Sequence, residues 1–279
     1  MDKVSNLQPA LFLHIQKTAG TSIVDLARNE YGIENVVSHG DYLEAGQPLS
    51  VRSQTAEDKI STEIFHAPDF HQTPFISGHF GYDFARQFMS GRFFFTFLRD
   101  PIERILSYYY FSRTRDPKEY EIYALAQHYT LDEFLALGLE KPALKACIWN
   151  NQAWLLAHGY GNLDKRHILM FSENEILQLA VDHLDEFSYI GFTETFEKDR
   201  DVILKALGIA RPWRKIVSNA TPGRPKNPDL PESTMRLLYE LTHLDRALYE
   251  RAWKMYQKPG VKQRVATFLE KLGTWSTRA

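Results

Sequence analysis

The sequence predicts an α/β fold with a mostly parallel central sheet flanked by helices. Short apolar runs, each long enough for one buried strand, alternate with amphipathic stretches that have the spacing of a helix face. Alternation of this kind is typical of parallel strands covered by helices on both faces. No linker divides the 279 residues, so we expect a single domain over residues 1–279.

The first half of the chain supplies three predicted strands. Residues 10–15 (ALFLHI) suit a buried strand, and they lead through a polar loop into an amphipathic helix over residues 21–31. Residues 75–77 predict a short strand and residues 93–98 (FFFTFL) a strongly buried one, after which Pro101 is well placed to begin a helix. The chain therefore opens as an α/β unit.

The second half is mostly helical, beginning with residues 131–158, which are rich in Ala, Leu and Trp. Further predicted elements are strands at residues 167–171 and 189–192, a helix at 196–207, a proline-rich extended loop at 210–231 and a helix in two pieces at 231–256. Residues 38–72 are polar and irregular, which suits an insertion or a lid. The C-terminal segment 261–279 carries a last predicted helix, which could pack on the domain or lie on a membrane surface.

Composition excludes several classes of protein. The net charge is −2, without the basic excess that general nucleic-acid binding requires. No apolar run approaches the roughly 20 residues of a membrane span. The short polar N-terminus has no signal-peptide core, so we expect the true start of a cytoplasmic protein. Cys147 is the only cysteine, which precludes an intramolecular disulfide and fits a reducing compartment; we interpret it as a buried structural thiol.

Residues 17–22 (KTAGTS) predict an anion-binding loop. Where a loop enters a helix, several backbone N–H groups are free and the helix dipole adds partial positive charge. Gly20 lets the backbone approach a ligand closely, and Lys17 adds a full charge. Hydroxyl donors come from Thr18, Thr21 and Ser22. The alternative is that Thr21 or Ser22 only caps the helix and that Lys17 is a solvated surface charge.

Arg99 directly follows the strand at residues 93–98, at the carboxyl end where open α/β sheets bind ligands. Its guanidinium suits a phosphate. Ser107 lies about two helical turns further on, so Arg99 must fold back along the helix for both to touch one phosphate. The alternatives are that Arg99 pairs with Asp100 or Glu103 and that Ser107 bonds to the preceding turn.

Together, these two segments resemble signatures of the carbohydrate sulfotransferases. Residues 14–22 (HIQKTAGTS) are similar to the His-(Ile/Val)-Pro-Lys-Thr loop of the heparan-sulfate 2-O-sulfotransferase group and its bacterial relatives, with Gln16 in place of the usual Pro. Residues 97–109 (FLRDPIERILSYY) resemble the second signature, RDPxxRxxSxY. Less specific similarities lie at residues 76–80 (ISGHF), 190–196 (IGFTETF) and 245–249 (DRALY).

The resemblance implies a P-loop-like sulfotransferase fold and the donor 3′-phosphoadenosine 5′-phosphosulfate (PAPS), with 3′,5′-adenosine bisphosphate as product and no metal. Arg99 and Ser107 would hold the 3′-phosphate. The proline-rich loop would close over the nucleotide, with Arg224 and Lys226 as further phosphate contacts. The first loop would hold the 5′-phosphosulfate through Lys17, Thr18, Ala19, Gly20, Thr21 and Ser22. The acceptor would be a hydroxyl of a saccharide or glycolipid.

His79 is the predicted general base, because it ends a strand between the two donor-binding segments and a neutral imidazole suits base work near pH 7. His66 and His71 are rivals. Asp83 is a fallback base, and the alternative for it is a solvated side chain. Some relatives carry a second histidine two residues before the base, where this chain has Ser77.

Other polar residues receive provisional roles. Lys17 would neutralise charge on the bridging oxygen of the leaving nucleotide, and we interpret His14 as structural. The polar residues 150–152 (NNQ), within an apolar helix, could contact an acceptor, whereas Trp149 and Trp154 are more typical of a core. The histidines show no metal-ligand spacing, so we expect no metal site.

Two other functions remain open. A nucleotide-dependent kinase would share the anion loop, but Lys17 precedes Gly20, whereas the lysine of the nucleoside-triphosphate loop follows the glycines. No acidic pair for Mg²⁺ is evident either. A non-catalytic nucleotide-binding module would keep Lys17 and Arg99 but need no base, so the His79→Ala protein would distinguish it from an enzyme.

Overall fold

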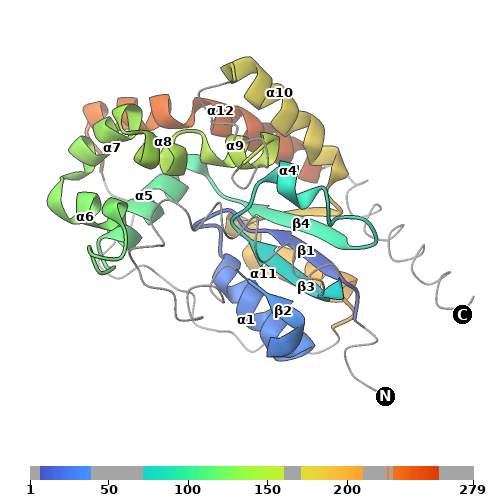
Figure 1. The fold of residues 1–279 in the computed structure, drawn as a ribbon. Coiled ribbons are helices and arrows are strands. Elements are labelled where there is room, and N and C mark those ends of the chain that lie inside the picture. Colours follow the sequence, from blue (N-terminus) through green and yellow to red (C-terminus); the bar gives the residue numbers. More distant parts are fainter. Residues whose placement is uncertain (1–6, 39–71, 160–170, 210–224, 226–228, 258–279) are drawn as a thin grey trace, which may run out of the picture.

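Among the residues that the structure describes, the central sheet has five parallel strands in the order β2-β3-β1-β4-β5 (Figure 1). The computed structural model describes residues 7–38, 72–159, 171–209, 225 and 229–257. The strands are β1 (Ala10–Leu13), β2 (Val36–Val37), β3 (Phe75–Gly78), β4 (Phe93–Leu98) and β5 (Tyr189–Phe192). The predicted α/β class is confirmed. The sequence did not predict β2, and the predicted strand at 167–171 lies almost wholly outside the described residues.

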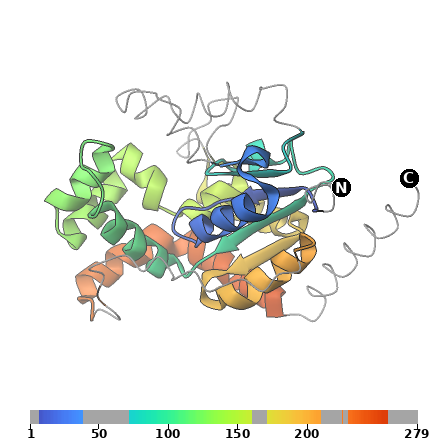
Figure 2. The same ribbon diagram turned by 90° about the horizontal axis from the view of Figure 1, so that it is seen from below.

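Helices cover both faces of the sheet. The face that carries Phe12 and Phe95 packs against α1 and α11. The blue helix α1 lies at the bottom of Figure 1, and Figure 2 shows α1 in blue and α11 in orange. The face that carries Leu11 and Phe94 packs in the larger core with the remaining longer helices. The helices are α1 (Gly20–Tyr31), α4 (Tyr82–Ala85), α5 (Pro101–Ser112), α6 (Glu121–His128), α7 (Leu131–Glu140), α8 (Pro142–Ile148), α9 (Asn151–Ala157), α10 (Glu173–His183), α11 (Phe196–Ala206) and α12 (Glu232–Gln257), with single 3₁₀ turns at Ile33–Asn35, Leu184–Glu186 and Thr193–Thr195.

The structure corrects two of the predicted helical stretches. The stretch expected as two pieces at residues 231–256 is one 26-residue helix, α12, because no Gly or Pro interrupts it and Leu238, Leu241 and Leu248 continue one fully buried face. The stretch at residues 131–158 is divided into α7, α8 and α9. Pro142 begins α8, and Asn150, in the left-handed region with φ of 43°, precedes α9.

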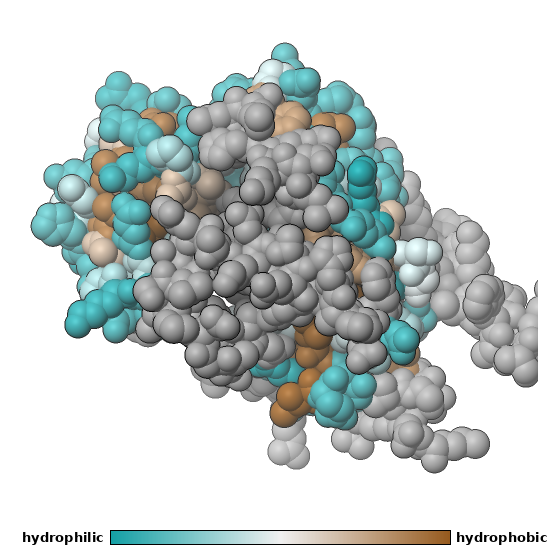
Figure 3. All heavy atoms as spheres, viewed as in Figure 1, coloured by the Kyte–Doolittle hydropathy of each residue, from teal (hydrophilic) through white to brown (hydrophobic). Residues whose placement is uncertain are grey.

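Hydrophilic residues predominate among the described residues on the face shown in Figure 3, with hydrophobic residues between them. In the described ranges, no helix combines the length and the apolar character needed to span a membrane. The lid or insertion expected at residues 38–72 lies outside the described residues except at its first residue, Ser38, and at residue 72. The C-terminal helix expected within 261–279 also lies outside them, so both stay predictions.

Candidate active site

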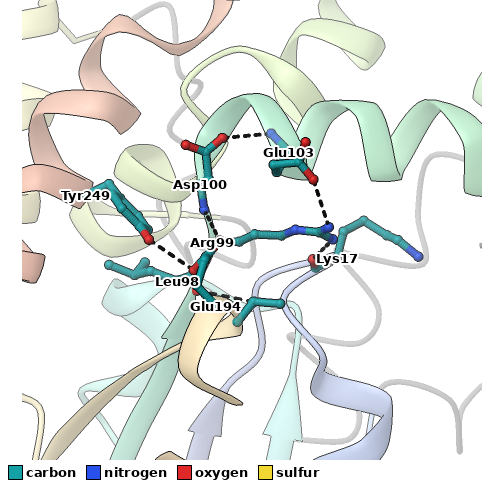
Figure 4. A network of polar contacts seen from close by, with 8 residues as sticks. Lys17, Leu98, Arg99, Asp100, Glu103, Glu194 and Tyr249 are labelled. Carbon is teal, nitrogen blue, oxygen red and sulfur yellow. Dashed lines mark hydrogen bonds and ion pairs between the residues drawn. The ribbon is translucent and has the colours of Figure 1, made fainter. Parts of the chain in front are cut away.

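The strand order brings the two predicted donor-binding segments together. The chain leaves β1 toward the β2–β3 side of the sheet through α1, whereas it leaves β4 toward β5 on the other side. Neighbouring strands whose connections diverge in this way form the crevice in which open α/β sheets bind ligands. A hydrogen bond from Arg99 Nη1 to the Lys17 carbonyl oxygen (3.1 Å) joins the two segments across this crevice (Figure 4).

The loop before α1 has a backbone suited to an anion. Lys17 and Ala19 adopt positive φ angles of 69° and 66°, which are costly for residues other than glycine and concentrate at functional sites. Left-handed residues interspersed in a turn direct successive N–H groups toward one side. The N-cap of α1 is Ala19, which has no polar side chain, so Thr21 and Ser22 lie in the first helical turn and are not the cap. The alternative capping role is therefore wrong.

Two loop residues have structural roles that the sequence did not reveal. A Cβ atom at Gly20 would lie 1.8 Å from His14 Nε2, so glycine makes room for the His14 ring beside the start of α1. Thr18 is fully buried and donates its hydroxyl to the Ile15 carbonyl oxygen (2.8 Å). That hydrogen bond stabilises the loop. Thr18 would therefore contribute its backbone N–H, and not its hydroxyl, to an anion site.

The ammonium group of Lys17 is largely withdrawn from water and lies 3.7 Å from the centroid of the Phe111 ring on α5. Attraction between a cation and a ring face favours this placement. Burial, together with the positive charges of Arg99 and Arg115, lowers the pKa of Lys17 to about 8. Lys17 is therefore not a solvated surface charge but a cation whose charge is sensitive to pH just above neutrality.

Arg99 runs back along α5, as a shared phosphate contact with Ser107 requires. Its Nη2 lies 3.5 Å from Glu103 Oε2, whereas the Asp100 carboxylate accepts a hydrogen bond from the Glu103 backbone N–H (2.9 Å) and caps α5 (Figure 4). Of the two alternative partners, the structure thus shows Glu103. Residues four apart share a helix face. Since Glu103 contacts Arg99 and Phe111 contacts Lys17, Ser107 between them lies on the face of α5 turned toward both cations.

The polar residues 150–152 are structural, which corrects their expected contact with an acceptor. All three are buried. Asn150 Oδ1 accepts hydrogen bonds from the Leu244 and Asp245 backbone N–H groups, and Asn151 donates to the Ala146 carbonyl oxygen (2.9 Å). Gln152 bonds to the main chain of Arg99.

Two of the less specific sequence similarities, at residues 190–196 and 245–249, also meet around the β4–α5 corner. Glu194, in the turn after β5, accepts a hydrogen bond from the Asp100 backbone N–H (2.8 Å) and another from the Tyr249 hydroxyl on α12 (3.0 Å) (Figure 4). Fully buried Arg104 donates to the Cys147 carbonyl oxygen. These motif residues therefore hold separate parts of the fold together.

His79 lies beside the first loop with a defined tautomer. Its Nδ1 lies 2.6 Å from the His14 carbonyl oxygen, which can only accept, so Nδ1 carries the proton and Nε2 of the neutral ring keeps a lone pair. The ring centroids of His79 and His14 lie 4.4 Å apart. The fallback base Asp83 is not merely solvated, since its Oδ2 lies 2.8 Å from Nδ1 of buried His158. Both rivals, His66 and His71, lie outside the described residues.

His14 lies closer to the candidate site than its expected structural role implied. Its ring stacks on that of Phe12, with the centroids 5.2 Å apart, so strand alternation continues one residue past the end of β1. The His14 ring occupies the space between Gly20 and His79 and so lies within the candidate site. Its position directly before the anion loop was the available signal.

The remaining predicted site residues, Arg224 and Lys226, lie outside the described residues. Within the described ranges, no group of three or more His, Cys, Asp or Glu side chains is placed to hold a metal ion. No curated protein sequence matches the chain. The model of the Sulfotransferase family matches residues 3–258, which include the anion loop, the β4–α5 corner and the whole of α12. The P-loop-like α/β fold and this match over nearly the whole chain show that the protein belongs to the sulfotransferase family.

Proposed function

We propose that this enzyme transfers the sulfuryl group of PAPS to a hydroxyl of a carbohydrate or glycolipid acceptor by in-line displacement. The observation that carries the proposal is the junction of Lys17 and Arg99, which brings an anion loop and a phosphate-type guanidinium to one crevice of the sheet. The whole chain, residues 1–279, would act as one sulfotransferase domain. Its single cysteine, Cys147, is compatible with the reducing cytoplasm that we propose as its location.

The donor would lie across the crevice between the two segments. The backbone N–H groups of residues 17–22 would hold the 5′-phosphosulfate at the start of α1, where the helix dipole favours an anion. Arg99 and Ser107 would hold the 3′-phosphate, the group that distinguishes this donor from ATP. Arg224 and Lys226 would add contacts from the proline-rich loop.

Transfer requires that the acceptor oxygen, the sulfur and the leaving phosphate oxygen lie in line. His79 Nε2 would take the acceptor proton as the new S–O bond forms, and such a base contributes about 10²–10⁴-fold. The old S–O bond breaks and its electron pair stays on the 5′-phosphate of the product. Lys17 would offset the charge that builds on that oxygen.

Calorimetric titration with 3′,5′-adenosine bisphosphate, 5′-AMP and ATP tests the donor site. We expect micromolar affinity that depends on the 3′-phosphate and is lost in Arg99→Ala. Equal preference for ATP would favour the kinase instead, and absence of all binding would refute the donor site. His79→Ala should keep nucleotide affinity but lose acceptor-dependent release of 3′,5′-adenosine bisphosphate from PAPS; unchanged release would exclude His79 as the base.

A further inference from the structure

The main chain of Arg99 is held by one side chain at both of its polar atoms. Gln152, the second residue of α9, accepts a hydrogen bond at Oε1 from the Arg99 backbone N–H (3.0 Å). Its Nε2 donates to the Arg99 carbonyl oxygen (2.9 Å). β4 ends at Leu98, so these two bonds fix the backbone just past the end of the strand ladder.

Gln152 is itself held firmly. It is 1% exposed. The carboxylate of Asp245, on α12, accepts hydrogen bonds from the backbone N–H groups of Gln152 (3.3 Å) and Ala153 (2.7 Å), which fixes the first turn of α9. Asp245 is fully buried, and the positive charge of Arg104 on α5 offsets part of the cost of burying its carboxylate. The amide of Gln152 therefore extends from a rigid helix start.

The Arg99 guanidinium depends on this backbone for its direction. Its side chain leaves the Cα atom between the two atoms that Gln152 holds and ends between the Lys17 carbonyl oxygen and Glu103. Rotation of the Arg99 peptide units would move the guanidinium away from the face of α5 that carries Ser107. A displacement of about 1 Å in a positioning group can cost up to about 100-fold in function.

We propose that Gln152 is a positioning residue that acts through Arg99 to set recognition of the donor's 3′-phosphate. This inference rests on the proposed function, in which Arg99 binds that phosphate. Gln152 touches neither donor nor acceptor, which separates it from the residues assigned above. Its contribution is the preference for nucleotides with a 3′-phosphate over those without one.

The test compares the affinities of 3′,5′-adenosine bisphosphate and 5′-AMP by calorimetry in the original protein and four variants. Gln152→Met keeps the length of the side chain but removes both hydrogen bonds. We expect it to weaken binding of the bisphosphate about 10-fold and to leave 5′-AMP within about twofold. Asn151→Ala is the matched control, because Asn151 is buried in the same helix and bonds only to Ala146 among the contacts described above. Combining Gln152→Met with Arg99→Ala should cause no further loss beyond Arg99→Ala alone.

The outcomes separate this inference from the proposed function. If the original protein shows no preference for the 3′-phosphate, the proposed function fails first. If that preference exists and Arg99→Ala abolishes it while Gln152→Met retains it, the inference alone is overturned. Equal weakening of both nucleotides, or the same loss in Asn151→Ala, would assign Gln152 a merely structural role. Should Gln152→Met not fold, Gln152→Asn keeps an amide that is one methylene too short, and an unchanged preference there also overturns the inference.

Discussion

At the scale of single residues, Lys17 combines a strained backbone with a buried charge. Its φ of 69° and its contact with Phe111 fix the ammonium group beside the anion loop. Because burial lowers the pKa of Lys17 to about 8, the ammonium is charged below that pH and becomes neutral above it. A bound phosphosulfate would raise the pKa again, since an adjacent anion favours the charged form.

We therefore predict that affinity for 3′,5′-adenosine bisphosphate declines as pH rises through about 8. Titrations between roughly pH 6.5 and pH 9.5 would show the decline, accompanied above pH 8 by proton uptake in buffers of different ionisation enthalpy. Lys17→Arg is the control, because a guanidinium stays charged throughout this range. A decline of the same size in Lys17→Arg would assign it to another group.

The structure shows contacts at Gly20 and His79 that the sequence motif alone does not reveal. Gly20 makes room for the His14 ring, which in its present position would overlap a Cβ atom there. His79 is oriented by the His14 carbonyl oxygen, which accepts from Nδ1 of the neutral ring. One residue, His14, thus influences both the anion loop and the base through two different groups, its ring and its carbonyl.

At the scale of helices and strands, local sequence signals determined most boundaries. Pro101 begins α5, as predicted, and Asp100 before it caps the helix. The apolar runs of β1, β3, β4 and β5 appear where they were predicted, because a strand buried on both faces needs continuous apolar residues. β2 was not predicted because its two residues are too few to show a strand pattern of apolar residues.

The junction of α9 and α12 depends on a buried carboxylate. Burial raises the pKa of Asp245 from 3.8 to about 6, against the opposing effects of Arg104 and of the hydrogen bonds from α9. The folded state thus binds this proton more tightly than the unfolded chain does. The stabilisation from protonation is complete below about pH 3.8 and is lost as pH rises through about 6.

We predict that Asp245→Asn changes the pH dependence of stability accordingly. A shift of about 2 pKa units corresponds to about 3 kcal/mol, so the free energy of unfolding of the original protein should fall by up to about that amount relative to Asp245→Asn between about pH 4 and pH 7. Urea unfolding of both proteins at several pH values in this range measures the difference. Parallel curves would show that Asp245 titrates normally in the folded protein.

At the scale of the whole molecule, the site joins parts of the chain that are far apart. The Arg99–Lys17 bond joins the loops after β1 and β4, and Glu194 connects the β4–α5 corner with the end of β5 and with α12. Helices on both faces bury this central sheet. A ligand that bridges these loops should therefore stabilise the structure as one unit.

We predict that the chain unfolds in a single transition and that bound nucleotide stabilises the whole structure against that transition. At 3′,5′-adenosine bisphosphate concentrations about 100 times Kd, the free energy of unfolding should increase by about 2.7 kcal/mol. Calorimetry or urea unfolding followed by fluorescence and circular dichroism would measure the shift, with 5′-AMP at the same concentration as the control. Two separate transitions, of which only one responds, would contradict a single domain.

The sequence by itself determined the α/β class, four of the five described strands and the two segments that meet at the crevice. These depend on apolar periodicity and turn chemistry, which are local properties of the chain. Tertiary structure alone decided that Gln152 supports Arg99, 53 residues away, and that His14 lies beside His79, 65 residues away. Periodicity tells which face of an element is buried but not which residues meet there, because that follows from how the helices pack on the sheet.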